Sequence, residues 1–207
     1  MTTRGKIEEA EYFLSRFEQT PIDVLKYEVS AFLSATRSIF DHMLEEYRVT
    51  FILGDIKFLS VNTFEDQATK RNNMKALEFL KWYKDRMSAL RNNPDYGFLF
   101  EKRDHNVHRD SSKQVTRLTW EGPITIEAKS EVEIPLAIPR NIRTPTQVEG
   151  KVTKDNKTET FRTEIIAQVF FEENKDVSMS DLCSALLRDT KTMVEEAEKT
   201  WRLQYKA

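Results

Sequence analysis

The sequence predicts an α+β fold, with helices in the first half of the chain and strands in most of the second half. Apolar residues recur at three- and four-residue steps up to about residue 110, which is the period of an amphipathic helix. β-branched and aromatic residues then alternate from about residue 116 to residue 171, which is typical of strands with one buried face. Apolar residues make up 39% of the 207 residues and charged residues 32%, a composition typical of a folded domain with highly charged helices.

Four helices are expected within residues 1–112. Thr20 offers a hydroxyl N-cap for the second helix, and Pro21 suits its first helical position. Asn92-Asn93-Pro94 should break the chain between the third and fourth helices. The four are expected at Lys6–Phe17, from Thr20 to just before Gly54, from a cap at Thr63 to about Arg91, and from a cap at Asp95 to about Ser112. Their short connections predict an antiparallel four-helix bundle.

Residues 113–207 are expected to form a small antiparallel sheet and a C-terminal helix. The clearest hairpin turns at Lys154-Asp155-Asn156-Lys157, whereas Pro135 and Pro139 place their own strand at an edge. The expected strands are Thr116–Trp120, Ile124–Ala128, Val132–Ile138, Gln147–Thr153 and Glu159–Glu172. The last helix, Ser180–Tyr205, either lies on the sheet or returns to the bundle. Residues 113–207 therefore form a second unit or pack on the bundle as one domain.

Charge and cysteine content restrict the possible functions. The net charge of −2 gives no support for bulk electrostatic binding of nucleic acid, so such a partner would need a local patch. The single cysteine, Cys183, excludes an internal disulfide and fits a reducing compartment. No apolar run approaches the ~20 residues of a membrane-spanning helix. We therefore expect a cytoplasmic protein without a membrane partner.

The residues best able to do chemistry near neutral pH are concentrated in Phe98–Arg109, with the sequence FLFEKRDHNVHR. On a helix, Asp104 and His108 share a face, and Arg103 can reach round to them. Charged residues at the end of a helix are also typical of a solvated face without function. A third interpretation is a zinc site built from three histidines, with His42 approaching His105 and His108. No cysteine or paired-carboxylate motif reinforces it, and we expect no metal and no cofactor.

Arg103-Asp104-x-x-x-His108 resembles the R-x4-6-H signature of the HEPN superfamily, small helical-bundle domains common in prokaryotic defence and toxin–antitoxin systems. The resemblance covers about Ile22–Asp110 and leaves the strand-rich segment aside. It implies a metal-independent endoribonuclease that acts as a homodimer with a composite site. His108 would be the general acid or base, Arg103 would stabilise the transition state, and Asp104 would either orient His108 or hold Arg103 in place. The 2′-hydroxyl of RNA would be the nucleophile, so DNA would not be a substrate.

Further substrate contacts are expected from Lys102, Arg109 and Arg37. Arg37 and Asp41, one turn apart, either line the same cleft or form an ordinary surface pair. An antitoxin or another protein is a possible partner. The alternative function is a non-catalytic HEPN-like module that dimerises and uses the strands to bind a protein or ligand, for example through an unpaired edge near Val132–Ile138. In a third alternative, Arg103 and His108 are purely structural.

Overall fold

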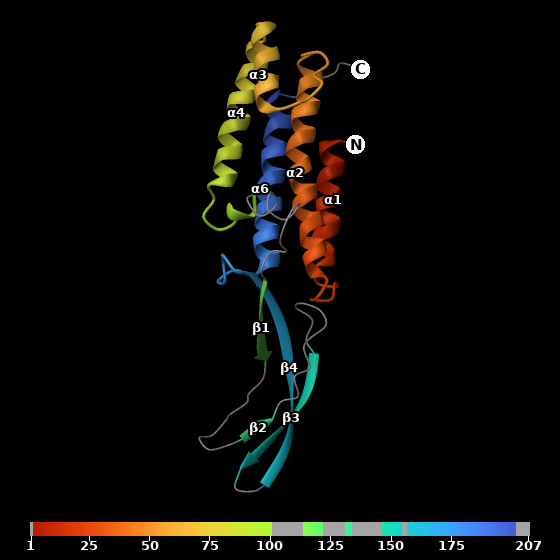
Figure 1. Ribbon diagram of the computed structural model, residues 1–207, viewed down its shortest axis with the longest axis vertical. Helices are drawn as coiled ribbons and strands as arrows, with labels where there is room; N and C mark the ends of the chain where they lie inside the picture. The colour runs from red at the N-terminus through yellow and green to blue at the C-terminus, as the bar shows by residue number, and fades with distance from the viewer. Residues whose placement is uncertain (1, 101–113, 122–130, 134–145, 155–156, 202–207) are drawn as a thin grey trace.

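A bundle of long helices and a narrow antiparallel sheet extending from one end of it make up the molecule (Figure 1). The computed structural model describes residues 2–100, 114–121, 131–133, 146–154 and 157–201. In this part of the chain, α1 and α4 run toward the sheet, whereas α2 and α6 run away from it. No helix of the described residues is long and apolar enough to cross a membrane.

The first two helices form the most regular part of the bundle. Helix α1, Thr3–Arg16, begins at Thr2, whose hydroxyl accepts a hydrogen bond from the Gly5 amide at 3.1 Å. Helix α2, Leu25–Thr50, begins later than the sequence predicted. The N-cap residue is Val24, without a side-chain cap, so the prediction of Thr20 as N-cap was wrong. The reason is local: the Thr20 amide donates to Arg16 O as α1 ends, and Pro21 O accepts from the Val24 amide in a separate turn.

The single helix expected from Thr63 to Arg91 is two helices, α3, Val61–Lys70, and α4, Met74–Arg91. Ser60, not Thr63, caps α3, and Thr63 completes the capping box as its third residue. The break follows from Asn72, which has a positive φ of 49°, a conformation that asparagine tolerates better than most residues. Asn73 then caps α4 through the Ala76 amide at 3.1 Å. The predicted end of this helix before Asn92 is confirmed.

The C-terminal helix α6, Met179–Trp201, returns to the bundle, which is the second of the two positions the sequence allowed. Its buried face packs against α1, α2 and α4. Ion pairs at the surface join it to two of these helices: Lys191 to Glu11 of α1 at 2.6 Å, and Arg86 of α4 to Glu196 at 2.7 Å. The fourth helix expected from Asp95 lies mostly outside the described residues, so α6 is the fourth long helix of the part that is described.

An aromatic cluster centred on Phe79 joins three of these helices. Phe79 is fully buried and stacks on Tyr47 of α2 with ring centroids 4.2 Å apart. Trp201 of α6 meets the same ring edge-on at 5.7 Å. Other rings near Phe79 are Phe51, Phe64, Trp82 and Tyr83. Because such pairs have defined geometry, this cluster fixes how α2, α4 and α6 lie against one another.

The sheet has four antiparallel strands in the order β1-β4-β3-β2. Strands β3, Thr146–Lys154, and β4, Lys157–Phe171, form the predicted hairpin, with Lys154 paired to Lys157. Strand β1, Gln114–Glu121, pairs with the bundle-proximal half of β4. Strand β2, Glu131–Glu133, is at an edge, as predicted for that segment. The expected strand Ile124–Ala128 and the remainder of Val132–Ile138 lie outside the described residues.

Strand β4 connects the sheet to the bundle. Its last residues, Val169, Phe170 and Phe171, are buried. The Phe171 ring meets Phe98 edge-on at 5.6 Å. Leu99 belongs to the core, and Phe98 and Phe100 pack against it, so this aromatic run is part of the bundle core.

Candidate functional site

Of the six predicted site residues, the structure describes Arg37. Lys102, Arg103, Asp104, His108 and Arg109 all lie outside the described residues, as does His105. His42 is described, and its Nδ1 lies 2.8 Å from Ser38 O on the preceding turn of α2. No group of three or more His, Cys, Asp or Glu side chains that could hold a metal occurs in the described parts of the chain.

Arg37 lines a cavity of about 650 Å³ between α2 and α4. The cavity combines an apolar wall with charged groups of both signs. It is lined by Arg37, Phe40, Asp41, Leu44, Leu59, Ser60, Val61, Tyr83, Met87, Arg91, Asn92, Gly97 and Phe100. Volumes of 300 to 1,000 Å³ are typical of sites for small molecules, so there is room for one ligand of that size.

The helical period explains why α2 and α4 each present one row of side chains to the cavity. Arg37, Phe40, Asp41 and Leu44 are spaced by three and four residues and therefore form one face of α2. On α4, Tyr83, Met87 and Arg91 repeat every four residues and face them. Arg37 and Asp41 thus line the same cleft, which is the first of the two arrangements that the sequence allowed.

A tight turn after α4 supplies the third wall. A Cβ added to Gly97 would lie 2.2 Å from Arg91 O and 2.6 Å from Asn93 O, so only glycine fits against the end of α4. The turn is closed by the Gly97 amide, which donates to Asn93 O at 2.8 Å. It brings Phe100 onto the cavity, with its ring centroid 6.1 Å from that of Phe40.

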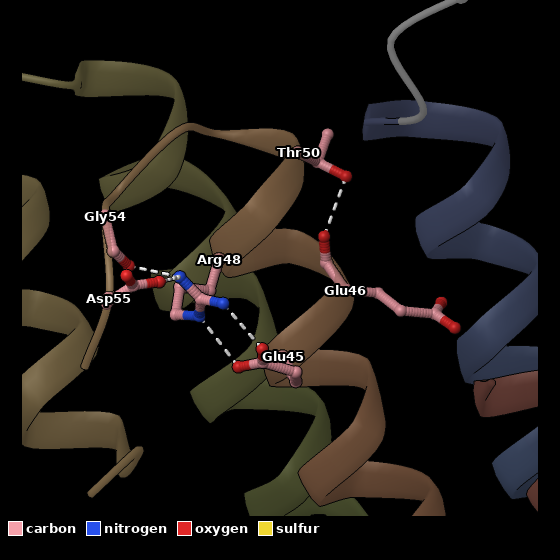
Figure 2. A network of polar contacts seen from close by, with 6 residues as sticks. All are labelled: Glu45, Glu46, Arg48, Thr50, Gly54 and Asp55. Atoms are coloured by element: carbon pink, nitrogen blue, oxygen red, sulfur yellow. Dashed lines mark hydrogen bonds and ion pairs between the residues drawn. The ribbon is translucent and has the colours of Figure 1, made fainter. Parts of the chain in front are cut away.

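The fourth wall, Leu59–Val61, follows the loop after α2, and Arg48 anchors the start of that loop. Figure 2 shows the Arg48 guanidinium between Glu45 and the loop. It donates to both carboxylate oxygens of Glu45, at 2.7 and 2.6 Å, and also to Gly54 O. Asp55 lies 3.7 Å from the same group. The hydrogen bond from Arg48 lowers the pKa of Glu45, so this anchor is charged at neutral pH.

The charged groups that line the cavity affect the pKa of Tyr83. Its ring is buried, and its hydroxyl donates to Phe40 O at 3.4 Å. Burial raises the pKa of Tyr83 well above its ordinary value, and the Asp41 carboxylate raises it further. Arg91 and Arg37 act in the opposite direction, so all three charged groups are close enough to influence the phenol. The hydroxyl is therefore a neutral hydrogen-bonding group, not a base.

Arg91, Tyr83 and Met87 were missed by the sequence analysis as site residues. Their four-residue spacing showed a common face on the predicted helix, but the sequence did not show that this face meets Arg37. What the arrangement offers chemically is two guanidinium groups for anions, one carboxylate for hydrogen-bond donors, and aromatic and aliphatic surface for a flat ring.

Comparison with known proteins found no relative of the chain. No family model matches the chain, and neither a curated protein nor a solved structure shows significant similarity to it.

Proposed function

We propose that the chain is a metal-independent endoribonuclease of HEPN type that acts as a homodimer and cleaves RNA with Arg103 and His108. The observation that carries the proposal is the position of Phe100. It is the last described residue before the motif, and it forms part of the wall of the cavity that holds Arg37 and Arg91. The cationic groups of α2 and α4 thus share a cavity with the chain that leads into the motif.

Chain connectivity supports a common site. Arg103 follows Phe100 by three residues, and an extended chain spans at most ~3.6 Å per residue, so their Cα atoms are separated by no more than ~11 Å. An arginine side chain can cover much of that distance. Arg37 and Arg91 would then hold phosphates of the RNA on either side of the scissile bond, because guanidinium groups bind phosphate oxygens in pairs.

In the proposed reaction, His108 removes the proton of a ribose 2′-hydroxyl, and the oxygen attacks the adjacent phosphorus. The bond from phosphorus to the 5′-oxygen breaks, and that oxygen takes up a proton from the conjugate acid of the same or the partner's histidine. The products are a 2′,3′-cyclic phosphate and a 5′-hydroxyl. Arg103 stabilises the extra negative charge on phosphorus in the transition state, and Asp104 orients His108.

The test is RNA cleavage in EDTA by purified full-length chain and three single variants. His108→Ala should lower the rate by roughly 10²–10⁴-fold, the usual contribution of a general acid or base. Arg103→Ala should lower it by a comparable factor. His105→Ala is the matched control, because it removes a neighbouring imidazole at a position that the motif leaves unspecified. Equal rates for wild type and His108→Ala, with unchanged thermal unfolding, would end the nuclease proposal.

The sheet favours a second candidate, a non-catalytic module that dimerises and binds a protein. The β3–β4 hairpin carries the sheet away from the bundle, and cleavage within the bundle does not require it (Figure 1). In this case the partner, an antitoxin or another cytoplasmic protein, should be captured equally by wild type and His108→Ala. A buried free thiol, Cys183, agrees with a reducing compartment for either function.

A further inference from the structure

Two charged side chains of the cavity have no hydrogen-bond or ion-pair partner among the residues that the structure describes. Asp41 of α2 and Arg91 of α4 are both exposed and both line it. Neither side chain forms a hydrogen bond or ion pair with another residue of the described chain. By contrast, acids and bases elsewhere in the bundle pair across helices, as Arg16 does with Glu28 at 2.9 Å and Lys84 with Glu65 at 2.6 Å. Two opposite charges left apart in one cavity suit a ligand that itself carries both kinds of group.

The remaining wall is apolar. Phe100 and Met87 are partly exposed and offer ring and thioether surface, and Leu59 and Val61 add aliphatic contacts, whereas Phe40 is buried. Single-stranded RNA is recognised by bases that leave the stack, lie on aromatic side chains and expose their Watson–Crick edge. A nucleotide therefore carries the three groups that match this lining: a flat ring, a hydrogen-bonding edge and a phosphate.

The carboxylate discriminates between the bases. A carboxylate accepts hydrogen bonds and donates none, so it binds two adjacent donors best. Guanine presents such a pair, N1–H and N2–H. Adenine and cytosine present an amino group next to an acceptor nitrogen, and uracil presents one N–H between two carbonyl oxygens. An acceptor facing a carboxylate is repelled, so Asp41 favours guanine over the other three.

We propose that this cavity binds one unstacked guanine of the RNA, with Asp41 accepting from N1–H and N2–H and Arg91 binding the attached phosphate. The identification of the ligand as RNA rests on the proposed function. The base preference rests on Asp41 and the apolar wall. Asp41 is then a specificity-determining residue that does not take part in bond cleavage.

The experiment is calorimetric titration of the full-length chain with single nucleotides, which requires no cleavage. Guanosine 5′-monophosphate should bind at least ~10-fold more tightly than the adenosine, cytidine and uridine monophosphates. Inosine 5′-monophosphate lacks the N2 amino group and should bind about tenfold more weakly than the guanosine nucleotide. Asp41→Asn should reduce the preference for guanine to ~3-fold or less, because the amide offers a donor in place of an acceptor.

Two further variants separate base from phosphate. Arg91→Ala should weaken all four monophosphates alike and leave guanosine itself unaffected. Asp85→Asn, an exposed acid of α4 outside the cavity, is the matched control and should change nothing. Equal affinities for the four nucleotides, no binding of the guanosine nucleotide at millimolar concentration, or a preference that survives Asp41→Asn would each overturn the inference. A chain that binds guanine through Asp41 but cuts no RNA would refute the nuclease alone. One that cuts RNA with no base preference and binds no nucleotide selectively would refute this inference alone.

Discussion

Replacing Gly97 by alanine tests how the cavity is built. The new methyl group would lie 2.2 Å from Arg91 O and 2.6 Å from Asn93 O. Both are backbone atoms at the end of α4, and neither can rotate away as a side chain would. Relief requires opening the turn, which also breaks the hydrogen bond from the Gly97 amide to Asn93 O. We expect a loss of about 2 kcal/mol in the free energy of unfolding, within the range for overpacking a rigid site.

That loss should lower the melting temperature by roughly 4–8 °C for a chain of this size, measured by circular dichroism or calorimetry. Gly5→Ala is the control, because Gly5 lies in the first turn of α1, where alanine is favoured by roughly 0.5–1 kcal/mol. Since Phe100 follows the turn, Gly97→Ala should also weaken nucleotide binding beyond what its stability loss explains. An unchanged melting temperature together with unchanged binding would refute the close packing described for this turn.

Three further predictions concern stability. Burial, helped by the 2.6 Å hydrogen bond to Asp189, raises the pKa of Tyr96, so the folded state keeps its proton longer than the unfolded state. The free energy of unfolding should therefore fall as pH rises above ~10, and Tyr96→Phe should make that decline shallower in urea titrations at several pH values; an unchanged slope would contradict this. Phe79→Ala removes the hub of the aromatic cluster and should cost about 3–5 kcal/mol in the same urea assay, and a loss below ~1 kcal/mol would be inconsistent with the packing. Cys183 is fully buried, which raises the pKa of its thiol, so it should react with a disulfide reagent only at the rate of unfolding; rapid stoichiometric labelling of native protein would count against it.

The long helix α2 could be predicted from the sequence because its apolar period continues without interruption up to Gly54. The break between α3 and α4 could not be predicted in the same way. It depends on the backbone of Asn72, and the apolar period does not change there. The adjacent asparagines were its only signal. The strands β1, β3 and β4 were predictable because alternation and the turn residues agree.

The cavity could be predicted only in part from the sequence. The sequence showed that Arg37 and Asp41 share a face, since this needs only the helical period. It could not show that Tyr83 and Arg91 face them, because that depends on which helices are neighbours and on how the Phe79 cluster orients them. The position of α6 was open for the same reason. The walls of the cavity and the position of α6 both depend on contacts between segments that are far apart in the sequence. Neither local helix propensity nor apolar periodicity contains information about such contacts.

The chemical nature of the cleaved ends tests the central claim most directly. An RNA oligonucleotide containing guanine should be incubated with the full-length chain in EDTA, and the fragment ends identified by mass spectrometry. We predict a 2′,3′-cyclic phosphate on one fragment, a 5′-hydroxyl on the other, and no cleavage when the ribose at the cut position is replaced by 2′-deoxyribose. Cleavage of the deoxy analogue at the same rate would contradict attack by the 2′-hydroxyl, and with it the role assigned to His108.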